Sequence, residues 1–359
     1  NNSKLLDSYL FNNIGFLYKY RGDIPLALKY YHRSLDIRKE IGEENAIANS
    51  LNNIAVIYND QGNIAKAIDY YQQSLTIYEE TGDRVGQALL LNNIGYVNFK
   101  VDEFDLAYDY YIKSLLIRTE TKDKKGISNS YGNIGMIYSK KGNIDSALFY
   151  YNASIEIDRD IGFKQGEASS LINLGGIQLK RQDTLLAIKT FERSLLLYEE
   201  LEDQNGIAIC WQSLAEIYFN LGDFQRAKGL SESSLILSKQ LGFPKEIRDA
   251  SEILYQMYKE QNNWKEALGM HEQFIEMKDS VWNEERTKST IRQQYKYTYE
   301  KQTSADSIVQ ADALALMDVE AEKKDIELSN EKQQKLYLYL VLGLVALFTL
   351  FLYNRFKVT

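Results

Sequence analysis

Apolar, small and aromatic residues recur along most of this 359-residue chain with a period of 40 positions. One marker is the tetrapeptide Asn12-Asn13-Ile14-Gly15, whose counterparts begin at residues 52, 92, 132 and 172. A second marker is an alanine, found at Ala27, Ala67, Ala107, Ala147, Ala187, Ala227 and Ala267. A third is an aromatic residue four positions later, found at Tyr31, Tyr71, Tyr111, Tyr151 and Phe191. Seven units follow one another without insertion or deletion, which indicates a repeat array rather than two or three ordinary domains.

Each unit predicts two helices joined by a short turn. In the second unit, apolar residues fall on one helical face before Gly62 and again after Asn63. Asn63 is expected to cap the second helix, and Gly82 to end it in a left-handed conformation. Ala55 and Ala67 let the two helices approach closely, and the aromatic residue after the alanine is expected to fill the space between neighbouring units. The predicted fold class is therefore all-α.

The pattern resembles the tetratricopeptide repeat, in which Trp, Leu-Gly and Tyr on a first helix precede Ala and Phe on a second. The sixth unit carries Trp211, Leu214, Ala215, Tyr218 and Ala227 at the matching positions. The family unit has about 34 residues, so a longer unit predicts helices extended by about a turn. The resemblance covers residues 2–281. It implies a right-handed superhelical solenoid of seven helix-turn-helix units, assigned to residues 1–281, with a concave surface for partners.

The repeat period stops near Trp282, and the segment 282–335 has a different composition. Residues 283–335 contain no proline or glycine and are rich in Glu, Lys, Gln and Ala. They predict one long helix of about 80 Å, at about 1.5 Å per residue. A coiled-coil spacing can be traced from Ile291 to Ile326, although several seam positions are polar. A coiled-coil-like signalling helix is one interpretation, and a solvated charged helix is the other.

Residues 336–353 are 18 consecutive positions without a charge. A helix of this length spans about 27 Å, close to the thickness of the hydrocarbon core of a bilayer. Tyrosines lie at both ends of the run, where interfacial aromatic residues belong, and Lys335 and Arg355 bracket it. The segment predicts one transmembrane helix, followed by a juxtamembrane stub at 354–359. The alternative is a buried helix of a soluble protein.

The order of these parts resembles a group of bacterial sensor proteins common in Bacteroidetes. The resemblance rests on 294–302, 305–308 and 353–357. It implies a single-pass inner-membrane protein with periplasmic repeats and a cytoplasmic output domain, such as a histidine kinase, a SpoIIE-type serine phosphatase or a cyclase. We expect the chain to be cut at both ends and the signal to pass through 283–335 in a homodimer. The alternative is a tail-anchored scaffold for protein–protein interaction, with cytoplasmic repeats and no output domain.

The composition narrows the chemistry. There are 42 basic and 50 acidic side chains, and the net charge of −8 disfavours a nucleic-acid partner. The single cysteine, Cys210, excludes an internal disulfide, and with only two histidines it cannot build a Cys/His zinc site. His32 and His271 are expected to pack on second helices, and Cys210 in the core. We find no catalytic constellation and no Gly-rich phosphate loop, so we expect this chain to be no enzyme and to need no cofactor or metal; any kinase, phosphatase or cyclase activity would belong to the output domain.

The candidate binding residues are asparagines of the first helices. They are Asn13, Asn53, Asn93, Asn133 and Asn173, with Asn52 and Asn92 beside the second and third. Each of the five precedes the apolar residue that points into the core, so it is expected to face the concave side. A primary amide offers two donors and an acceptor, so a row of amides can hold a peptide backbone without reading its side chains. Similarity to kinesin light chain and to peptide-binding bacterial regulators implies peptide binding, whereas the alternative is that the amides only bond to the neighbouring unit.

Overall fold

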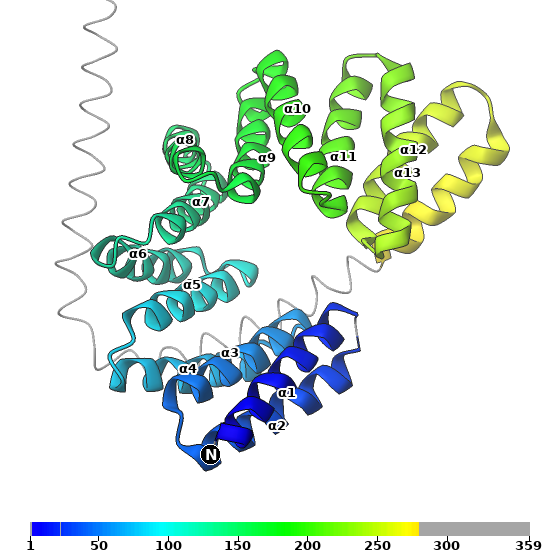
Figure 1. The fold of residues 1–359 in the computed structure, drawn as a ribbon. Helices are drawn as coiled ribbons and strands as arrows, with labels where there is room; N and C mark the ends of the chain where they lie inside the picture. Colours follow the sequence, from blue (N-terminus) through cyan, green and yellow to red (C-terminus); the bar gives the residue numbers. More distant parts are fainter. Residues whose placement is uncertain (1, 22, 280–359) are drawn as a thin grey trace, which may run out of the picture. The chain divides into compact units, whose positions relative to one another are not determined.

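The computed structural model describes residues 2–21 and 23–279, and all the regular secondary structure within them is α-helical. The helices are α1 Asn2–Tyr20, α2 Ile24–Ile41, α3 Glu44–Asp60, α4 Ile64–Glu80, α5 Arg84–Lys100, α6 Phe104–Glu120, α7 Lys124–Lys140, α8 Ile144–Asp160, α9 Lys164–Lys180, α10 Thr184–Glu200, α11 Gln204–Asn220, α12 Phe224–Leu241 and α13 Pro244–Glu260 (Figure 1). Residues 264–279 form a further helical stretch. The expected all-α repeat array is confirmed over these residues.

Several predictions made from the sequence lie outside the described residues. They are the coiled-coil-like helix over 282–335, the transmembrane helix over 336–353, the stub over 354–359 and the homodimer contact through 283–335. Among the described helices, none combines the length and the apolar character that a membrane crossing requires.

The helices recur with the same 40-residue period as the sequence. From α3 onward, the first helices of successive units begin at residues 44, 84, 124, 164, 204 and 244, and the second helices begin at 64, 104, 144, 184 and 224. From α1 to α11, each first helix packs most extensively on the second helix of its own unit, and each of the second helices α2 to α12 also packs on the first helix of the next unit. A helix pair cannot bury its apolar face alone, so every unit completes the core of its neighbour.

The small and aromatic markers meet in the core. A Cβ added to Gly135 would lie 2.8 Å from Tyr151 Cε1, so the ring lies directly against the backbone of the first helix. In the preceding units, Tyr71 packs in one buried cluster with Ala55 of its own unit and Leu90 of the next. The expected packing role is confirmed: the small residue admits the ring, and the ring contacts both its own unit and the following one.

Several helix ends follow the predicted caps. The side chains of Asp23 and Asn63 each accept a hydrogen bond from the backbone N–H three residues later. Asp183 occupies the same position in its unit but makes no such bond. At the other end of the second helices, Gly42 and Gly82 adopt φ values of 74° and 71°, where a Cβ would be strained. Local turn chemistry therefore sets the ends of many of these helices, although α3, α6, α9, α10 and α13 begin without a side-chain cap.

A buried serine ties the two helices of a unit together, and the sequence analysis did not identify it. The hydroxyls of Ser34 and Ser74 donate to the backbone carbonyl 26 residues earlier, at 2.8 and 2.7 Å. The same bond recurs at Ser114, Ser194 and Ser234. In the fourth unit the pattern changes, because the hydroxyl of Ser154 instead contacts the hydroxyls of Ser128 and Ser170, each at 2.9 Å.

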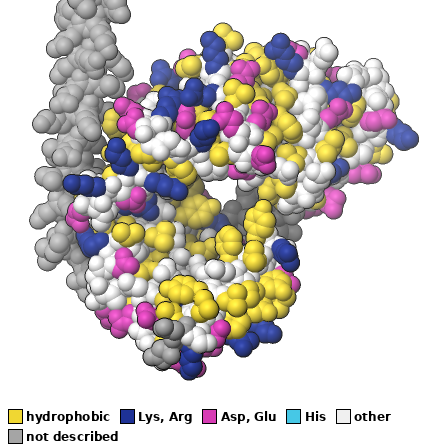
Figure 2. All heavy atoms as spheres, viewed as in Figure 1, with side chains coloured by type: hydrophobic (Ala, Val, Ile, Leu, Met, Phe, Trp, Pro, Cys, Tyr) yellow, Lys and Arg dark blue, Asp and Glu magenta, His cyan; other side chains and the backbone are white. Residues whose placement is uncertain are grey.

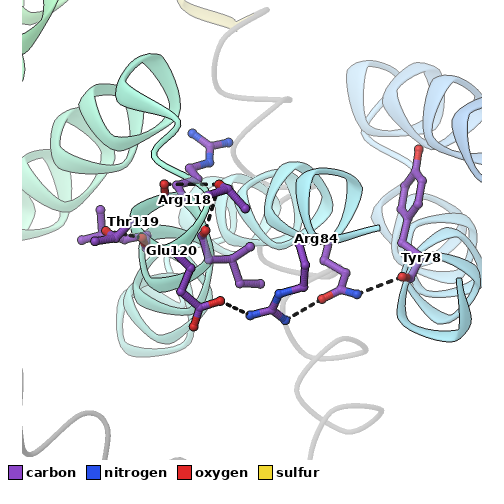
Figure 3. Close-up of polar contacts among 9 residues, drawn as sticks. Tyr78, Arg84, Arg118, Thr119 and Glu120 are labelled. Carbon is purple, nitrogen blue, oxygen red and sulfur yellow. Dashed lines mark hydrogen bonds and ion pairs between the residues drawn. The ribbon is translucent and has the colours of Figure 1, made fainter. Parts of the chain in front are cut away.

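Polar contacts also fix neighbouring units against each other. Figure 3 shows such a chain at the start of α5, where Gln87 Nε2 donates to the carbonyl of Tyr78 at 2.8 Å and Arg84 donates to Gln87 Oε1 at 2.9 Å. Arg84 also pairs with Glu120 at the end of α6. This ion pair is half-exposed, so it contributes less than about 1 kcal/mol. The bond from Gln87 is buried and joins α5 to the last turn of α4, where the same carbonyl also accepts from the backbone N–H of Asp83 at 3.0 Å.

Candidate functional site

The asparagine row lies on the first helices of successive units and is joined by side-chain hydrogen bonds. Asn53 Nδ2 donates to Asn12 Oδ1 at 2.9 Å. The same bond runs from Asn93 to Asn52 at 2.9 Å and from Asn133 to Asn92 at 2.8 Å. Each donor follows its acceptor by 41 residues, so the first helices of neighbouring units lie side by side with their amides in register.

These bonds bear on both interpretations of the row, namely that its amides bind a peptide and that they only join neighbouring units. One bond uses a single N–H of the donor amide and one lone pair of the acceptor oxygen, so each amide keeps further hydrogen-bonding groups. Asn53, Asn93 and Asn133 are part-buried rather than buried, which leaves some of these groups accessible. The row therefore fixes the spacing of the units and still presents donors and acceptors at its surface. Binding of a peptide by these residues stays a prediction.

The row is interrupted after the fourth unit. Asn13 at its beginning is exposed, and Asn173 at its other end is half-buried. Within the described part of the chain, Asn173 makes no hydrogen bond to a neighbouring unit, because Gly132 stands where the acceptors Asn52 and Asn92 stand in earlier units. The amide of Asn173 therefore remains available at the point where the row ends.

A hollow of about 370 Å³ opens at this interruption. Its lining includes Asn92 of α5, Asn133 and Met136 of α7, Asp158 of α8, Phe163 at the start of α9, and Asn173 of α9. We call it the unit-4 hollow. It shares three amides with the asparagine row, so the row and the hollow form one continuous surface on the first helices.

Asp158 is the charged side chain that lines this hollow, and the charge of Lys125 offsets the cost of its burial only in part. Its side chain is 1 % exposed, and neither carboxylate oxygen has a hydrogen-bond partner among the described residues. Burial raises the pKa of this carboxyl; the nearby Ser128 hydroxyl counteracts the rise in part, and the charge of Glu167 adds to it. Glu167 itself is buried but compensated, since its Oε1 lies 2.7 Å from Arg159 Nε and 2.9 Å from Arg193 Nη2.

Replacing Asp158 by Asn is expected to stabilise the fold at neutral pH by about 1 kcal/mol, the usual size of an unpaired buried polar group. The raised pKa of the folded state means that the ionised carboxylate destabilises the native protein at high pH. The penalty disappears as the pH falls through the raised pKa towards the unfolded value of 3.8, so the advantage of Asp158→Asn should disappear there too. Urea unfolding of both proteins between pH 4 and pH 8 measures this difference.

The charged groups that face Asp158 are Glu167 and Lys125, and both are present in the two proteins, so their titration cancels in the comparison. If the Asp158→Asn protein were less stable than the wild type at pH 7, the claim that the ionised Asp158 carboxylate destabilises the fold would be contradicted.

A second hollow of about 400 Å³ lies between α11 and α13. It is lined by Gln212, Glu216, Arg248, Asp249 and Glu252, among others. Its arginine is already paired, because Arg248 Nε donates to Asp249 Oδ1 at 2.7 Å. This hollow therefore offers a weaker case for a charged ligand than the unit-4 hollow does.

Reactive side chains are packed away from these surfaces. Cys210 is fully buried, and burial raises the pKa of its thiol to about 11, which suppresses the reactive thiolate. His271 packs against Tyr255 with 4.7 Å between ring centroids, and His32 packs against Tyr70 at 6.3 Å. Within the described ranges, no group of three His, Cys, Asp or Glu residues is arranged to hold a metal ion.

Surface charge does not mark out a site. Figure 2 shows acidic and basic side chains interspersed over the visible face of the molecule. Lys100 Nζ lies 3.4 Å from the carbonyl of Asn59, and Lys180 Nζ lies 3.5 Å from that of Ser139, so two lysines contact the end of the preceding first helix. Selection of a ligand by charge must therefore come from individual groups such as Asp158.

Sequence reasoning did not identify Gly132, Asp158 or Phe163. The sequence does carry a signal for them. At each of the three positions, the neighbouring units have a residue of another chemical type. That three such departures meet at one surface became visible only in the folded array.

Comparison with known proteins gives a consistent answer on the fold. A family model described as tetratricopeptide repeat matches residues 7–80, 86–160 and 166–240, more than half of the chain. No curated protein matches the sequence. The solved structure of a Rap protein complexed with Competence and Sporulation Factor is 17 % identical, with a TM-score of 0.60, over 77 % of this chain and 76 % of that one.

Two further solved structures are similar. The Rap conjugation gene regulator of plasmid pLS20, in complex with the Phr* peptide, is 14 % identical, with a TM-score of 0.59, over 79 % of this chain and 77 % of that one. BtubC from P. vanneervenii is 19 % identical, with a TM-score of 0.52, over 60 % of this chain and 91 % of that one. The extent of the family match, together with the helical repeat, shows that this chain belongs to the tetratricopeptide repeat family.

Proposed function

We propose that this chain binds a peptide or protein segment along the face made by its first helices. The proposed contact residues are Asn13, Asn52, Asn53, Asn92, Asn93, Asn133 and Asn173. The observation that carries the proposal is the row of paired amides, each pair held in register by a bond of 2.8–2.9 Å between units. An extended segment presents N–H and C=O groups at regular intervals, and fixed amides with spare donors and acceptors complement it.

Two similar structures support a ligand of this class. A Rap protein was solved with Competence and Sporulation Factor, and the pLS20 Rap regulator with the Phr* peptide. At 17 % and 14 % identity they support the fold, so the contact residues proposed here come from the geometry of this chain.

We propose further that the array is the sensor region of a single-pass membrane signalling protein. In this proposal 336–353 crosses the inner membrane, the repeats are periplasmic, and 283–335 pairs in a homodimer. Binding shifts this helix pair between two arrangements and so controls an output domain, such as a histidine kinase or a serine phosphatase. Support comes from the uncharged run at 336–353 and from the absence of proline and glycine in 283–335.

The test separates a sensor from a membrane-tethered scaffold. Expressed in bacteria, the full chain is expected to stay in the membrane pellet through an alkaline carbonate wash, and deletion of 336–353 should release it. An amine-reactive crosslinker added to these membranes should trap dimers, in a proportion that changes when a binding peptide is added. Membrane-bound protein that crosslinks only as monomers, with and without peptide, would contradict the sensor and favour the scaffold.

A further inference from the structure

Three departures from the repeat meet at the unit-4 hollow. Gly132 replaces the asparagine of the earlier units, and Phe163 stands where neighbouring units place the helix-capping acids Asp83, Asp123 and Asp203. The third departure is Asp158, whose counterparts in the neighbouring units are Tyr78, Arg118 and Tyr198. All three residues line the same hollow.

The departure at Asp158 changes the side chain that forms one wall of the hollow. In the unit before it, the long side chain of Arg118 crosses to the next first helix, where Nη1 donates to the carbonyl of Gly126 at 2.6 Å. The shorter side chain of Asp158 also points towards the next first helix. Its Oδ2 lies 2.5 Å from the position of a Cβ added to Gly166, which is the counterpart of Gly126. The ring of Phe163 lies against the same point, with Cδ1 2.5 Å from it, so Asp158 and Phe163 together stand beside Gly166 where a single tyrosine stands beside Gly86 and Gly206.

The walls of the hollow suit an organic cation. Asp158 supplies a buried carboxylate with both oxygens unbonded among the described residues. The amides of Asn133 and Asn173 add acceptor oxygens beside it, and the ring of Phe163 adds an aromatic surface. A carboxylate, amide oxygens and an aromatic face together complement a guanidinium group, which donates in a planar fork and stacks on rings.

Within the described part of the chain, the charge of Lys125 acts on Asp158, but no basic side chain forms an ion pair with it. The nearest basic side chain, Lys125, places Nζ 4.1 Å from the centroid of the Phe163 ring and forms no ion pair with Asp158. Arg159 and Arg193 are committed to Glu167. A buried carboxylate that stays unpaired costs stability, which is typical of a group kept for a ligand rather than for the fold.

We infer that the unit-4 hollow receives the guanidinium or ammonium group of a basic side chain carried by the bound segment, and that Asp158 pairs with it. This inference rests on the proposed peptide binding along the asparagine row. It adds selectivity that the row itself lacks, since amides hold a backbone whatever its side chains, whereas Asp158 requires a positive charge at one position. The net charge of −8 also favours approach of a basic segment.

The test is a selection of random displayed peptides on the full chain in detergent, run in parallel on the wild type and on Asp158→Asn. Both proteins are expected to enrich peptides, but only the wild type should enrich Arg or Lys at one fixed position. Replacing that arginine by citrulline, which keeps the shape and removes the charge, should weaken binding to the wild type by about tenfold or more. The same replacement should change binding to Asp158→Asn by less than about twofold.

A second variant fills the hollow without touching the acid. A Cβ added to Gly132 would meet only the hydroxyls of Ser170 and Ser154, at 3.6 and 3.7 Å, which is ordinary van der Waals contact, so Gly132→Asn is the variant that we choose. It restores the acceptor that the row lacks, and it should abolish the preference for a basic residue while leaving peptide binding in place. Melting temperatures of both variants at or above that of the wild type show that the folds are intact.

The outcomes are distinct. Peptides enriched on the wild type without a basic position, an equal citrulline effect on both proteins, or a basic preference that survives Gly132→Asn would each overturn the inference and leave the proposed function standing. Enrichment of no peptide by either protein would overturn the proposed function itself. If free argininamide competes as strongly as the selected peptide, the hollow belongs to a small cation and the peptide assignment is wrong.

Discussion

The Gly135→Val protein is expected to lose about 3 kcal/mol of stability, at the upper end of the usual cost of overpacking a core. A Cβ at this position already lies 2.8 Å from Tyr151 Cε1, and Tyr151 is 2 % exposed, so the ring has no free volume to enter. The two further methyl groups of valine must therefore push α7 and α8 apart. The measurement is the urea midpoint of helicity, followed by circular dichroism.

Two controls separate overpacking from other effects. Gly135→Ala is expected to lower the midpoint much less than Gly135→Val does, because its single Cβ requires only a small shift of Tyr151, and Ala55 packs with Tyr71 in the second unit, where it is fully buried. Gly176→Val adds the same side chain to a first helix at a glycine whose Cβ would meet nothing within 4 Å, so it should be tolerated. If Gly135→Val and Gly176→Val had equal urea midpoints, close packing of the Tyr151 ring against Gly135 would not be required for stability.

The combined variant Asn53→Ala, Asn93→Ala and Asn133→Ala is expected to bind a selected peptide about 100-fold more weakly. Each amide contributes one hydrogen bond worth about 1 kcal/mol, and about 1.4 kcal/mol corresponds to a factor of ten. Because the same residues donate to the preceding unit, a modest loss of stability should accompany the change. Fluorescence anisotropy with a labelled peptide measures the affinity, and circular dichroism measures the helicity.

The matched control replaces exposed amides of second helices, Gln73→Ala and Asn152→Ala, whose hydrogen bonds stay within one helix. It should bind the peptide as the wild type does. A row variant that keeps both its helicity and its affinity would show that the amides do not contact the ligand. One that loses its helical fold at room temperature would show that the row is structural.

Local features were predictable because their causes lie within a few residues. Asn63 caps a helix through a backbone N–H three residues away, and Gly82 ends one through its own φ. The fit of Tyr71 against Ala55 was also predictable, because a small residue and an aromatic residue recur at these positions in the first five units. Periodicity alone therefore led to the helices, their ends and the residues of the core.

The site depended on contacts that periodicity does not determine. The bond from Asn53 to Asn12 spans 41 residues, and whether such amides meet depends on how neighbouring first helices slide against each other. Gly132, Asp158 and Phe163 lie on α7, on α8 and just before α9, so their meeting requires the packing of three helices. In the sequence they look like three unrelated departures from the repeat.

The most direct test of the binding face is photo-crosslinking of a selected peptide with benzoylphenylalanine at its centre, followed by mass spectrometry of the adducts. The expected adducts lie on the first helices α3, α5 and α7, close to Asn53, Asn93 and Asn133. Adducts confined to the second helices α4, α6 and α8 would contradict binding along the asparagine row.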